Sequence, residues 1–469
     1  MKNAVLYFAA AVFFAAVFAG CGRENAGRAL ADADMERERL VRAAKDAYVY
    51  GFPLVLNEVI KRAAENPLAE TENASINRIR HFNSFADETF AYFIRPDSSV
   101  FYSFAWLDVS KEPMLIEIPE TGKRYVLFSL FDGWGDVFAS LGSRLSGGNA
   151  LKAAVCGPGW QGVVPQGFEQ YKADTAAVLI KAAIEVKNKQ DGETAVKKIQ
   201  NGIKLYPLSA YGGQYRVPEA VSGVIPGADM PLERVLSMDI SDFFNTLNRL
   251  MMKNPPRPQD AKLLDEILDI GVAPGMRFDI SVFDFDTREA FKEIPQWMKS
   301  FFEEMKNEGM EQGWIYGYGF GDYKDDYVFR AKTAYYLPAA DRHEDLLCAF
   351  SYFDCDKEKY DSSKKYVLHF DKNAFPPVKA GWSLCAYNDR GLVMNNPDGR
   401  RSICGRDGLE FNKDGSLDIY IQKENPGKNR LKNWLPVSGN GFALMLRCYL
   451  PEKALTDGVW KAPAVEKTR

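Results

Sequence analysis

Two carboxylates and an aromatic ring occupy alternate positions in the segment FDGWGDVF, residues 131–138. If this segment is a β-strand, Asp132, Trp134 and Asp136 share one face, because successive side chains of a strand alternate between its two sides. An aromatic ring beside carboxylates is typical of a saccharide-binding surface: the ring stacks on the apolar face of the sugar, and the carboxylates accept hydrogen bonds from hydroxyl groups. We therefore interpret Asp132 and Asp136 as candidate catalytic acids and Trp134 as a candidate binding residue.

The spacing of the two acids tests this interpretation. In an extended strand the backbones of Asp132 and Asp136 lie about 13 Å apart, whereas the acid pair of a glycosidase lies about 5 to 9.5 Å apart. A bend at Gly133 or Gly135 would bring the acids closer together. The alternative is a glycine-containing turn at the rim of a sheet, carrying surface acids that have no catalytic role.

Three further residues are candidates for the same site. Asp97 is a third candidate catalytic acid, and Tyr102 and Arg144 are candidate binding residues, with Arg144 orienting the substrate. Each also has a structural interpretation, because an arginine among acids usually forms an ion pair and a tyrosine in a strand is common core material. Arg124 is open to the same two interpretations as Arg144.

The sequence shows no signature of a metal site or a cofactor site. Its three histidines, His81, His343 and His369, are scattered and stand in no zinc-type spacing with cysteine. The loop NKDGSLD lacks the spacing of an EF-hand, and its Asp-Gly step indicates a hairpin. Neither a phosphate-binding glycine loop nor a G-x-S-x-G element is present. We expect no metal and no cofactor, while a Ser-His-Asp triad assembled in space stays open.

The composition is that of an ordinary globular protein. The chain has 469 residues, of which 46% are hydrophobic and 26% charged, so we expect two or three substructures rather than one small module. The formal net charge is -4, with both signs interspersed along the chain. Because no broad basic surface results, we expect no nucleic-acid partner.

The N-terminus has the features of a bacterial lipoprotein. Lys2 precedes an apolar run that ends at Cys21, with small residues directly before the cysteine. We interpret residues 1–20 as a lipoprotein signal peptide, Cys21 as the lipidated first residue of the mature protein, and residues 21–34 as a tether. The protein would then be membrane-anchored in the cell envelope, in a Gram-negative cell at the outer membrane and facing the periplasm. A plain cleaved signal or a membrane helix is the alternative.

Six cysteines remain besides Cys21, most of them in the C-terminal third of the chain. An even number permits a set of disulfides in an oxidising compartment. Buried free thiols are the alternative.

Apolar periodicity predicts an α+β fold that is mostly β. Residues 35–190 read as N-terminal helices, split into two at Gly51 and Pro53, followed by a first β domain of short antiparallel strands. Residues 191–337 carry helical spacing and are predicted to form a bridge. Residues 338–469 return to a β pattern, so they are predicted to form a second β domain of similar size, which would be consistent with a distant duplication.

Several motifs identify a family resemblance. The chain resembles the paired domains of unknown function 1254 and 1214. The motifs that carry this resemblance in the first half are AYVYGFPLV, RPDSSVFYSFAWLDVS and FDGWGDVFASLGSR. Those in the second half are FPPVKAGWSLCAYN and NKDGSLDIYIQKENPGKNRLKNWLP. The resemblance implies two jelly-roll-like β domains with helical elements between them, and fixes no chemistry. The chain departs from the family pattern at Ser99, Asp136, Gly381, Cys385 and Asn388, which predicts an altered or inactive member if those positions carry function.

These observations give two functional hypotheses. The first is a lipid-anchored envelope protein that binds a glycan, or hydrolyses it by carboxylate acid-base chemistry, through the acidic-aromatic cluster. The second is a non-catalytic envelope scaffold whose β domains serve protein assembly. The oligomeric state is left open by the sequence.

Overall fold

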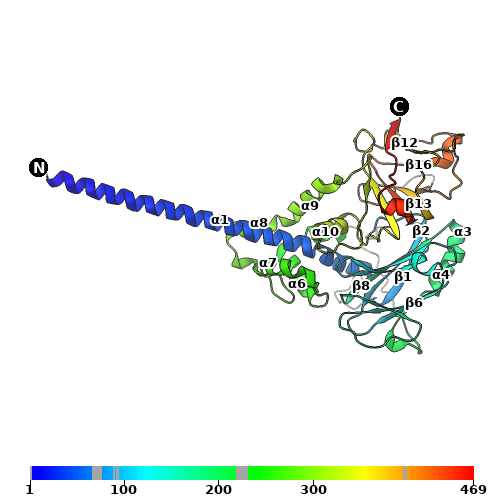
Figure 1. Ribbon diagram of the computed structural model, residues 1–469, viewed down its shortest axis with the longest axis horizontal. Helices are drawn as coiled ribbons and strands as arrows, with labels where there is room; N and C mark the ends of the chain where they lie inside the picture. The colour runs from blue at the N-terminus through cyan, green and yellow to red at the C-terminus, as the bar shows by residue number, and fades with distance from the viewer. Residues whose placement is uncertain are drawn as a thin grey trace.

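The computed structural model describes residues 3–65, 76–87, 90, 94–217, 231–394 and 399–468, with the side chains of residues 3–30, 64 and 65 outside that description. Two β domains lie next to each other at one end of the long helix α1 (Asn3–Glu65). The other large helices gather around the C-terminal part of α1 (Figure 1). The fold therefore places a helical cluster against two β bodies.

The first β domain consists of two sheets. Its five-stranded sheet has the order β1-β2-β8-β4-β5, and its four-stranded sheet has the order β7-β6-β3-β9. Neighbouring strands are antiparallel except β6 and β7, which are parallel. The strands are β1 (Arg78–His81), β2 (Val100–Asp108), β3 (Met114–Ile118), β4 (Val126–Asp132), β5 (Val137–Gly142), β6 (Leu151–Cys156), β7 (Glu169–Lys172), β8 (Ala177–Glu185) and β9 (Lys204–Pro207).

The second β domain also consists of two sheets. Their orders are β10-β11-β17-β13-β14 and β16-β15-β12-β18, and β15 and β16 form the one parallel pair among them. The strands are β10 (Ile315–Tyr316), β11 (Leu346–Ser351), β12 (Lys365–Phe370), β13 (Val378–Tyr387), β14 (Ser402–Cys404), β15 (Leu417–Gln422), β16 (Trp434–Pro436), β17 (Ala443–Pro451) and β18 (Val465–Thr468).

The two β domains share one topology. Adding nine to each strand number of the first domain reproduces the order of both sheets of the second domain. The parallel pair also falls at the corresponding place, β6 with β7 and β15 with β16. This match supports the duplication that the sequence pattern suggested.

Each β domain has its own core, and a third core joins them. One cluster fills the space between the two sheets of the first domain, and another does so in the second. The largest cluster combines the helices with residues from the outer faces of both five-stranded sheets. Strands β2, β4 and β11 are therefore buried along nearly their whole length, which explains their nearly continuous apolar sequences.

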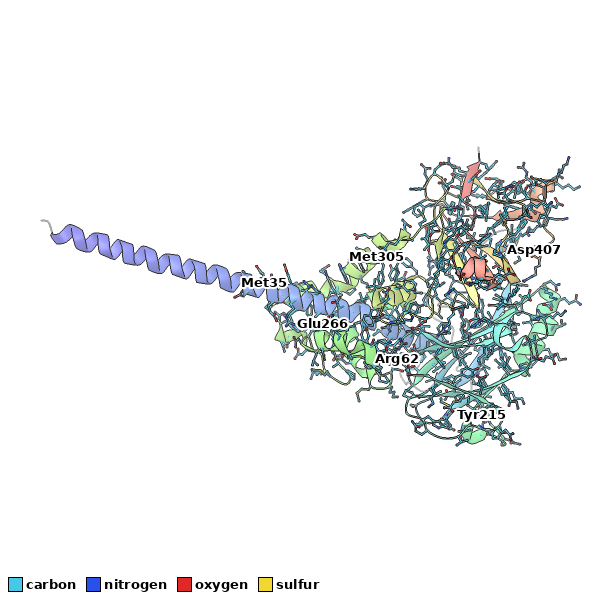
Figure 2. All side chains as sticks on the ribbon, in the orientation of Figure 1. Met35, Arg62, Tyr215, Glu266, Met305 and Asp407 are labelled. Carbon is cyan, nitrogen blue, oxygen red and sulfur yellow. The ribbon has the colours of Figure 1, made fainter. Side chains whose placement is uncertain are left out.

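The helices outside α1 are short. They are α2 (Ser143–Ser146), α3 (Lys189–Asp191), α4 (Lys197–Gly202), α5 (Pro231–Leu236), α6 (Ile240–Met251), α7 (Ala261–Leu268), α8 (Phe285–Lys292), α9 (Ile294–Glu304), α10 (Tyr327–Tyr336) and α11 (Lys453–Thr456). One-turn 3-10 or π segments lie at Gly192–Val196, Leu208–Ala210, Pro258–Asp260, Ile280–Val282, Met305–Asn307 and Lys428–Asn433. Glu266 on α7 and Met305 after α9 lie on either side of α1 (Figure 2).

The prediction that Gly51 and Pro53 split the N-terminal helix in two is wrong. Helix α1 runs through both residues without a break. Helices α5 to α10 all contact α1, and residues 49–56 of α1 are buried. This packing holds the helical path despite the backbone hydrogen bond that a proline cannot form. Gly51 is required because helix α6 approaches so closely: a Cβ at position 51 would lie 2.3 Å from Cδ2 of Leu247.

We predict that Gly51→Ala lowers the free energy of unfolding by about 1–3 kcal/mol, since the added methyl group overlaps a well-packed side chain. In a Leu247→Ala background the same change should cost little, because the overlapping group has been removed. Urea unfolding of the two single variants and the double variant measures this coupling. Equal costs in both backgrounds would contradict the contact.

The predicted fold class, mostly β with helices, is confirmed, with two refinements. The sheets are mixed rather than purely antiparallel. In addition, the predicted helical bridge, residues 191–337, contains two edge strands: β9 belongs to the first β domain and β10 to the second. Within the described part of the apolar segment GLVM, residues 391–394, Val393 forms an isolated antiparallel pairing with Tyr387.

The N-terminal predictions are not decided by the structure. The backbone of residues 3–34 is helical, including the segment predicted as a tether, and the side chain of Cys21 lies outside the description. Among the described residues, no helix is both long and apolar enough to span a bilayer. The six described cysteines are free thiols, which fits the alternative to disulfides; Cys355 is exposed and the other five are buried: Cys156, Cys348, Cys385, Cys404 and Cys448.

Candidate functional site

Asp132 is the last residue of β4 and Asp136 directly precedes β5, so the two acids flank a tight turn and do not lie along one strand. The Asp132 amide donates to the carbonyl of Asp136 at 2.9 Å, and the Gly135 amide donates to the carbonyl of Asp132 at 3.0 Å. Oδ1 of Asp132 accepts hydrogen bonds from the amides of Trp134 and Asp136. Gly135 adopts a φ of 91°, which the turn requires and a side chain disfavours. The bend predicted at the glycines is confirmed, and the strand interpretation is wrong.

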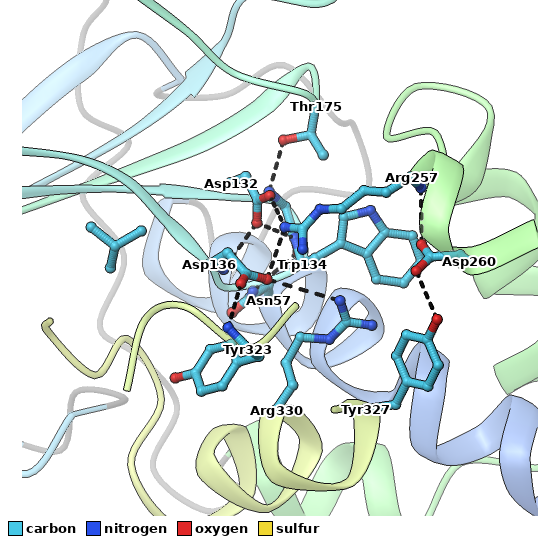
Figure 3. Close-up of polar contacts among 12 residues, drawn as sticks. Asn57, Asp132, Trp134, Asp136, Thr175, Arg257, Asp260, Tyr323, Tyr327 and Arg330 are labelled. Carbon is cyan, nitrogen blue, oxygen red and sulfur yellow. Dashed lines mark hydrogen bonds and ion pairs between the residues drawn. The ribbon is translucent and has the colours of Figure 1, made fainter. Parts of the chain in front are cut away.

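Arg257 joins the two acids. Its Nη2 donates to Oδ2 of Asp132 at 2.5 Å and to Oδ2 of Asp136 at 2.8 Å, so these two oxygens are at most the sum of those distances, 5.3 Å, apart. Asp132 is 3% exposed and Asp136 is 7% exposed, so the alternative of surface acids is wrong as well. Arg257 comes from the loop between α6 and α7, far along the chain (Figure 3).

A second arginine lies behind the pair. Arg330, on α10, is fully buried, and its Nη1 lies 3.8 Å from Oδ2 of Asp136. Its guanidinium lies 5.1 Å from the ring centre of Trp134 and 5.4 Å from those of Tyr50 and Tyr327. These rings stabilise the cation through their faces.

Asp260 fixes the loop that carries Arg257. Its carboxylate accepts hydrogen bonds from the hydroxyls of Tyr50 and Tyr327 and from the backbone amide of Arg257. The arginine is thereby held in place from α1, from α10 and from its own loop, as Figure 3 shows.

Trp134 does not offer a stacking surface. Its side chain is completely buried, and its ring packs on Tyr50 with the ring centres 4.7 Å apart. The predicted ligand-stacking role of Trp134 is therefore wrong. The partly exposed ring beside the acids is Phe138, on β5.

The acids line a cavity of about 380 Å³. Its wall combines the β4–β5 turn with Phe138, the loop of residues 255–259, Asp174, residues 321–324 and Arg342. The side chains of Asp174, Asp322 and Lys324 are exposed. Nη1 of Arg257 has no hydrogen-bond partner among the residues that the structure describes. Charges of both signs therefore face one polar cavity.

Burial raises the pKa of Asp132 to about 6, with the nearby Asp136 carboxylate acting in the same direction and Arg257 opposing both. An acid whose folded pKa exceeds its unfolded value binds more protons in the folded state. Its contribution to stability is therefore full below the unfolded pKa of about 4 and is lost as the pH rises through about 6.

We predict that wild type gains stability relative to Asp132→Asn as the pH falls from 7 to 4, by up to about 3 kcal/mol. The Asn variant removes the titrating group and keeps an acceptor for the turn. Urea unfolding of both proteins across this range measures the difference. A difference that does not change with pH would contradict a raised pKa at Asp132.

Family models match both β domains. The model described as protein of unknown function DUF1254 matches residues 76–207, and the one described as protein of unknown function DUF1214 matches residues 346–453. The chain belongs to the DUF1254/DUF1214 proteins. The DUF1254 match spans all nine strands of the first β domain, β1 to β9.

Two solved structures are similar to this DUF1254/DUF1214 chain. The VPA0106 protein from Vibrio parahaemolyticus is 23% identical, with a TM-score of 0.64 over 92% of this chain and 100% of that one, which shows a shared fold. An uncharacterized protein from Burkholderia cenocepacia is 10% identical, with a TM-score of 0.46 over 92% of this chain and 94% of that one. No curated protein matches the sequence.

Asp97 and Tyr102 lie in a different place, the seam between the DUF1254 and DUF1214 halves. Oδ2 of Asp97 accepts a hydrogen bond from Ser383 and lies 4.0 Å from Nε of Arg447, both in the DUF1214 half. The Tyr102 hydroxyl accepts a hydrogen bond from the amide of Asp97. Both residues are almost completely buried, so they do not join the cavity at Asp132.

Arg144 and Arg124 form ion pairs away from the cavity. Arg144 donates to both carboxylate oxygens of Asp345, at 2.6 and 2.9 Å, and Arg124 does the same with Asp191. The structural interpretation of both arginines fits these contacts. Among the described residues, no group of three or more His, Cys, Asp or Glu side chains is placed to hold a metal ion.

The DUF1214 half contains the same turn without the acid pair. Between β13 and β14, Asn388 replaces Asp132: its Oδ1 accepts from the amides of Arg390 and Leu392, and its own amide donates to the carbonyl of Leu392. Leu392 takes the position of Asp136, and Gly391 that of Gly135, again with a positive φ, 73°. Because Asn388 satisfies this turn, the turn itself does not require the charges of Asp132 and Asp136.

Proposed function

We propose that the cavity beside Asp132 and Asp136 binds a saccharide, and that it acts as a binding site rather than a hydrolytic one. The observation that carries this proposal is the arginine-bridged acid pair lining a polar cavity of about 380 Å³. The β13–β14 turn forms with the uncharged Asn388 in place of Asp132. This comparison indicates that the charges of Asp132 and Asp136 are needed to hold Arg257 in place and not to form the turn. Arg257 would then present a fixed donor to the ligand.

The character of the cavity wall favours a ligand rich in hydroxyl groups. Lys324 and Nη1 of Arg257 supply donors, while the exposed carboxylates of Asp174 and Asp322 supply acceptors. A sugar hydroxyl both donates and accepts, so it suits a wall of mixed character better than a purely anionic or cationic ligand does. Phe138 supplies the apolar surface for one face of the sugar ring.

Titration calorimetry on a protein that lacks residues 1–34 tests the proposal. The ligands are the glycans that bind the protein on a glycan array. Phe138→Ala should weaken binding about tenfold, since one stacked ring contributes about 1 kcal/mol or slightly more. Phe411→Ala, an exposed phenylalanine of the other half, is the matched control and should leave binding unchanged. The absence of saturable glycan binding, together with an oligomer on sizing, would favour the assembly hypothesis instead.

Hydrolysis is the second candidate. The separation of at most 5.3 Å between two carboxylate oxygens is compatible with the roughly 5–5.5 Å of retaining glycosidases, and the pKa of Asp132 of about 6 suits a general acid. Against it, every oxygen of both carboxylates already accepts a protein hydrogen bond. Sugar release from a bound glycan that is lost in Asp132→Asn would establish hydrolysis, whereas binding without product supports the proposal above.

We also propose that the protein is a lipoprotein of the cell envelope, anchored through Cys21. The support is the sequence alone: an apolar leader, small residues before the cysteine, and a small, charged segment after it. Mass spectrometry of protein from the membrane fraction should find residues 1–20 removed and acyl groups on Cys21. Cys21→Ser should release the protein from membranes; a variant that stays membrane-bound contradicts the anchor.

A further inference from the structure

A second cavity lies at the place in the DUF1214 half that corresponds to the first one. It has a volume of about 260 Å³ and is lined by residues 389–392 of the β13–β14 turn. That turn matches the β4–β5 turn in its hydrogen bonds, and the strands on either side match in sheet order. The two cavities are therefore equivalent parts of the two β domains.

The equivalence extends to an arginine that each turn receives from the opposite domain. Arg342, just ahead of β11, donates from Nη2 to the carbonyl of Val137 at 2.6 Å. Arg95, ahead of β2, packs against Gly391, where an added Cβ would lie 3.2 Å from its Nε. Each cavity thus combines the turn of one domain with an arginine of the other domain.

The floor of the second cavity differs in chemistry from that of the first. Where the first has Asp136, the second has Leu392. Leu232 and Pro338 are further apolar lining residues, and both are partly exposed. These side chains can contact the apolar body of a ligand.

Two cations meet at the side of this floor. Nη1 of Arg95 donates to the Tyr352 hydroxyl at 3.2 Å, and Nζ of Lys306 lies 4.6 Å from the centre of the same ring. Arg95 has no carboxylate partner among the described residues, and Lys306 has Glu303 at 3.6 Å. Both cations are half-buried, whereas the acids of the cavity, Glu233, Glu303 and Asp389, are exposed. A bound anion would interact favourably with both of these half-buried cations.

We propose that this second cavity binds a small amphiphilic anion, with its apolar body on Leu232, Pro338 and Leu392 and its carboxylate or phosphate group between Arg95 and Lys306. This proposal does not rest on saccharide binding at the first cavity. The size of the cavity, at the low end for ligand sites, limits the ligand to a short chain or a single ring.

Titration calorimetry with hexanoate, hexanol and hexylamine tests the proposal. Hexanoate should bind with a dissociation constant of about 1 mM or lower, and the two uncharged or cationic analogues should bind at least tenfold more weakly. Lys306→Met should weaken hexanoate binding at least fivefold. Lys292→Met is the matched control and should leave it unchanged, because Lys292 pairs with Glu289 three residues earlier, as Lys306 pairs with Glu303, and lines neither cavity.

Three results would overturn the proposal: no heat of hexanoate binding up to its solubility limit, equal binding of hexylamine, or a loss of binding in Lys292→Met in place of Lys306→Met. Methyl hexylphosphonate used alongside hexanoate distinguishes a carboxylate preference from a phosphate-like one. Circular dichroism of Lys306→Met checks that the fold is intact. This is expected, because the methionine retains most of the lysine stem.

Discussion

Replacing Arg257 with methionine is expected to lower the free energy of unfolding by about 3–5 kcal/mol at pH 7. The variant would leave the buried carboxylates of Asp132 and Asp136 close together, with Nη1 of Arg330 3.8 Å from Oδ2 of Asp136. Two unscreened negative charges in a buried site repel strongly, and each loses its solvation. Urea or thermal unfolding measures the loss.

The pH dependence of this loss separates electrostatics from packing. At pH 5 the acid pair can hold a proton, so the deficit of Arg257→Met should shrink, whereas a packing defect would stay constant. Arg39→Met is the matched control, because Arg39 also bonds two carboxylates, those of Glu36 and Asp269, in an exposed setting. Its cost should stay below about 1 kcal/mol.

Arg447→Met is expected to be similarly severe, at about 3–5 kcal/mol. Arg447, on β17 and 4% exposed, donates to the Tyr387 hydroxyl and to the carbonyl of Arg95, both at 2.6 Å, and faces the Asp97 carboxylate. Its removal would leave Asp97 buried without its nearest cation, along with an unpaired carbonyl. Chemical unfolding measures the loss.

The control for Arg447 is Lys152→Met. Lys152 pairs with Glu117 at 3.3 Å, with half of its side chain exposed, so its removal should cost less than about 1 kcal/mol. A cost for Arg447→Met within that range would show that the seam between the two halves does not depend on its ion pair.

Elements with strong local patterns were predictable from the sequence. The apolar runs at β2, β4, β8 and β17 predicted buried strands, and the amphipathic spacing of α6 and α7 predicted helices. The unbroken path of α1 was not predictable, because it depends on helices far along the chain that enclose residues 49–56. Local propensity at Gly51 and Pro53 carries no information about those partners.

The candidate site was predictable only in part. The closeness of Asp132 and Asp136 through a bend at the intervening glycines could be anticipated from residue types and spacing. Arg257 was not found, because ion pairing across such a sequence distance leaves no local pattern; the one available signal was a lone arginine in the proline-rich stretch PPRP. Trp134 was misassigned because a turn, unlike a strand, directs it inward. Phe138 was missed although it occupies an outward position of β5.

Both five-stranded sheets carry apolar side chains on their two faces, and one face of each is covered only by the helices and by the opposite half. If the chain were cut between the two halves, each half would lose the side chains of the other half that cover its five-stranded sheet. Either fragment alone would expose a broad apolar sheet face to water and would tend to aggregate. The two domains should therefore be expressed, purified and engineered together, because they share one core.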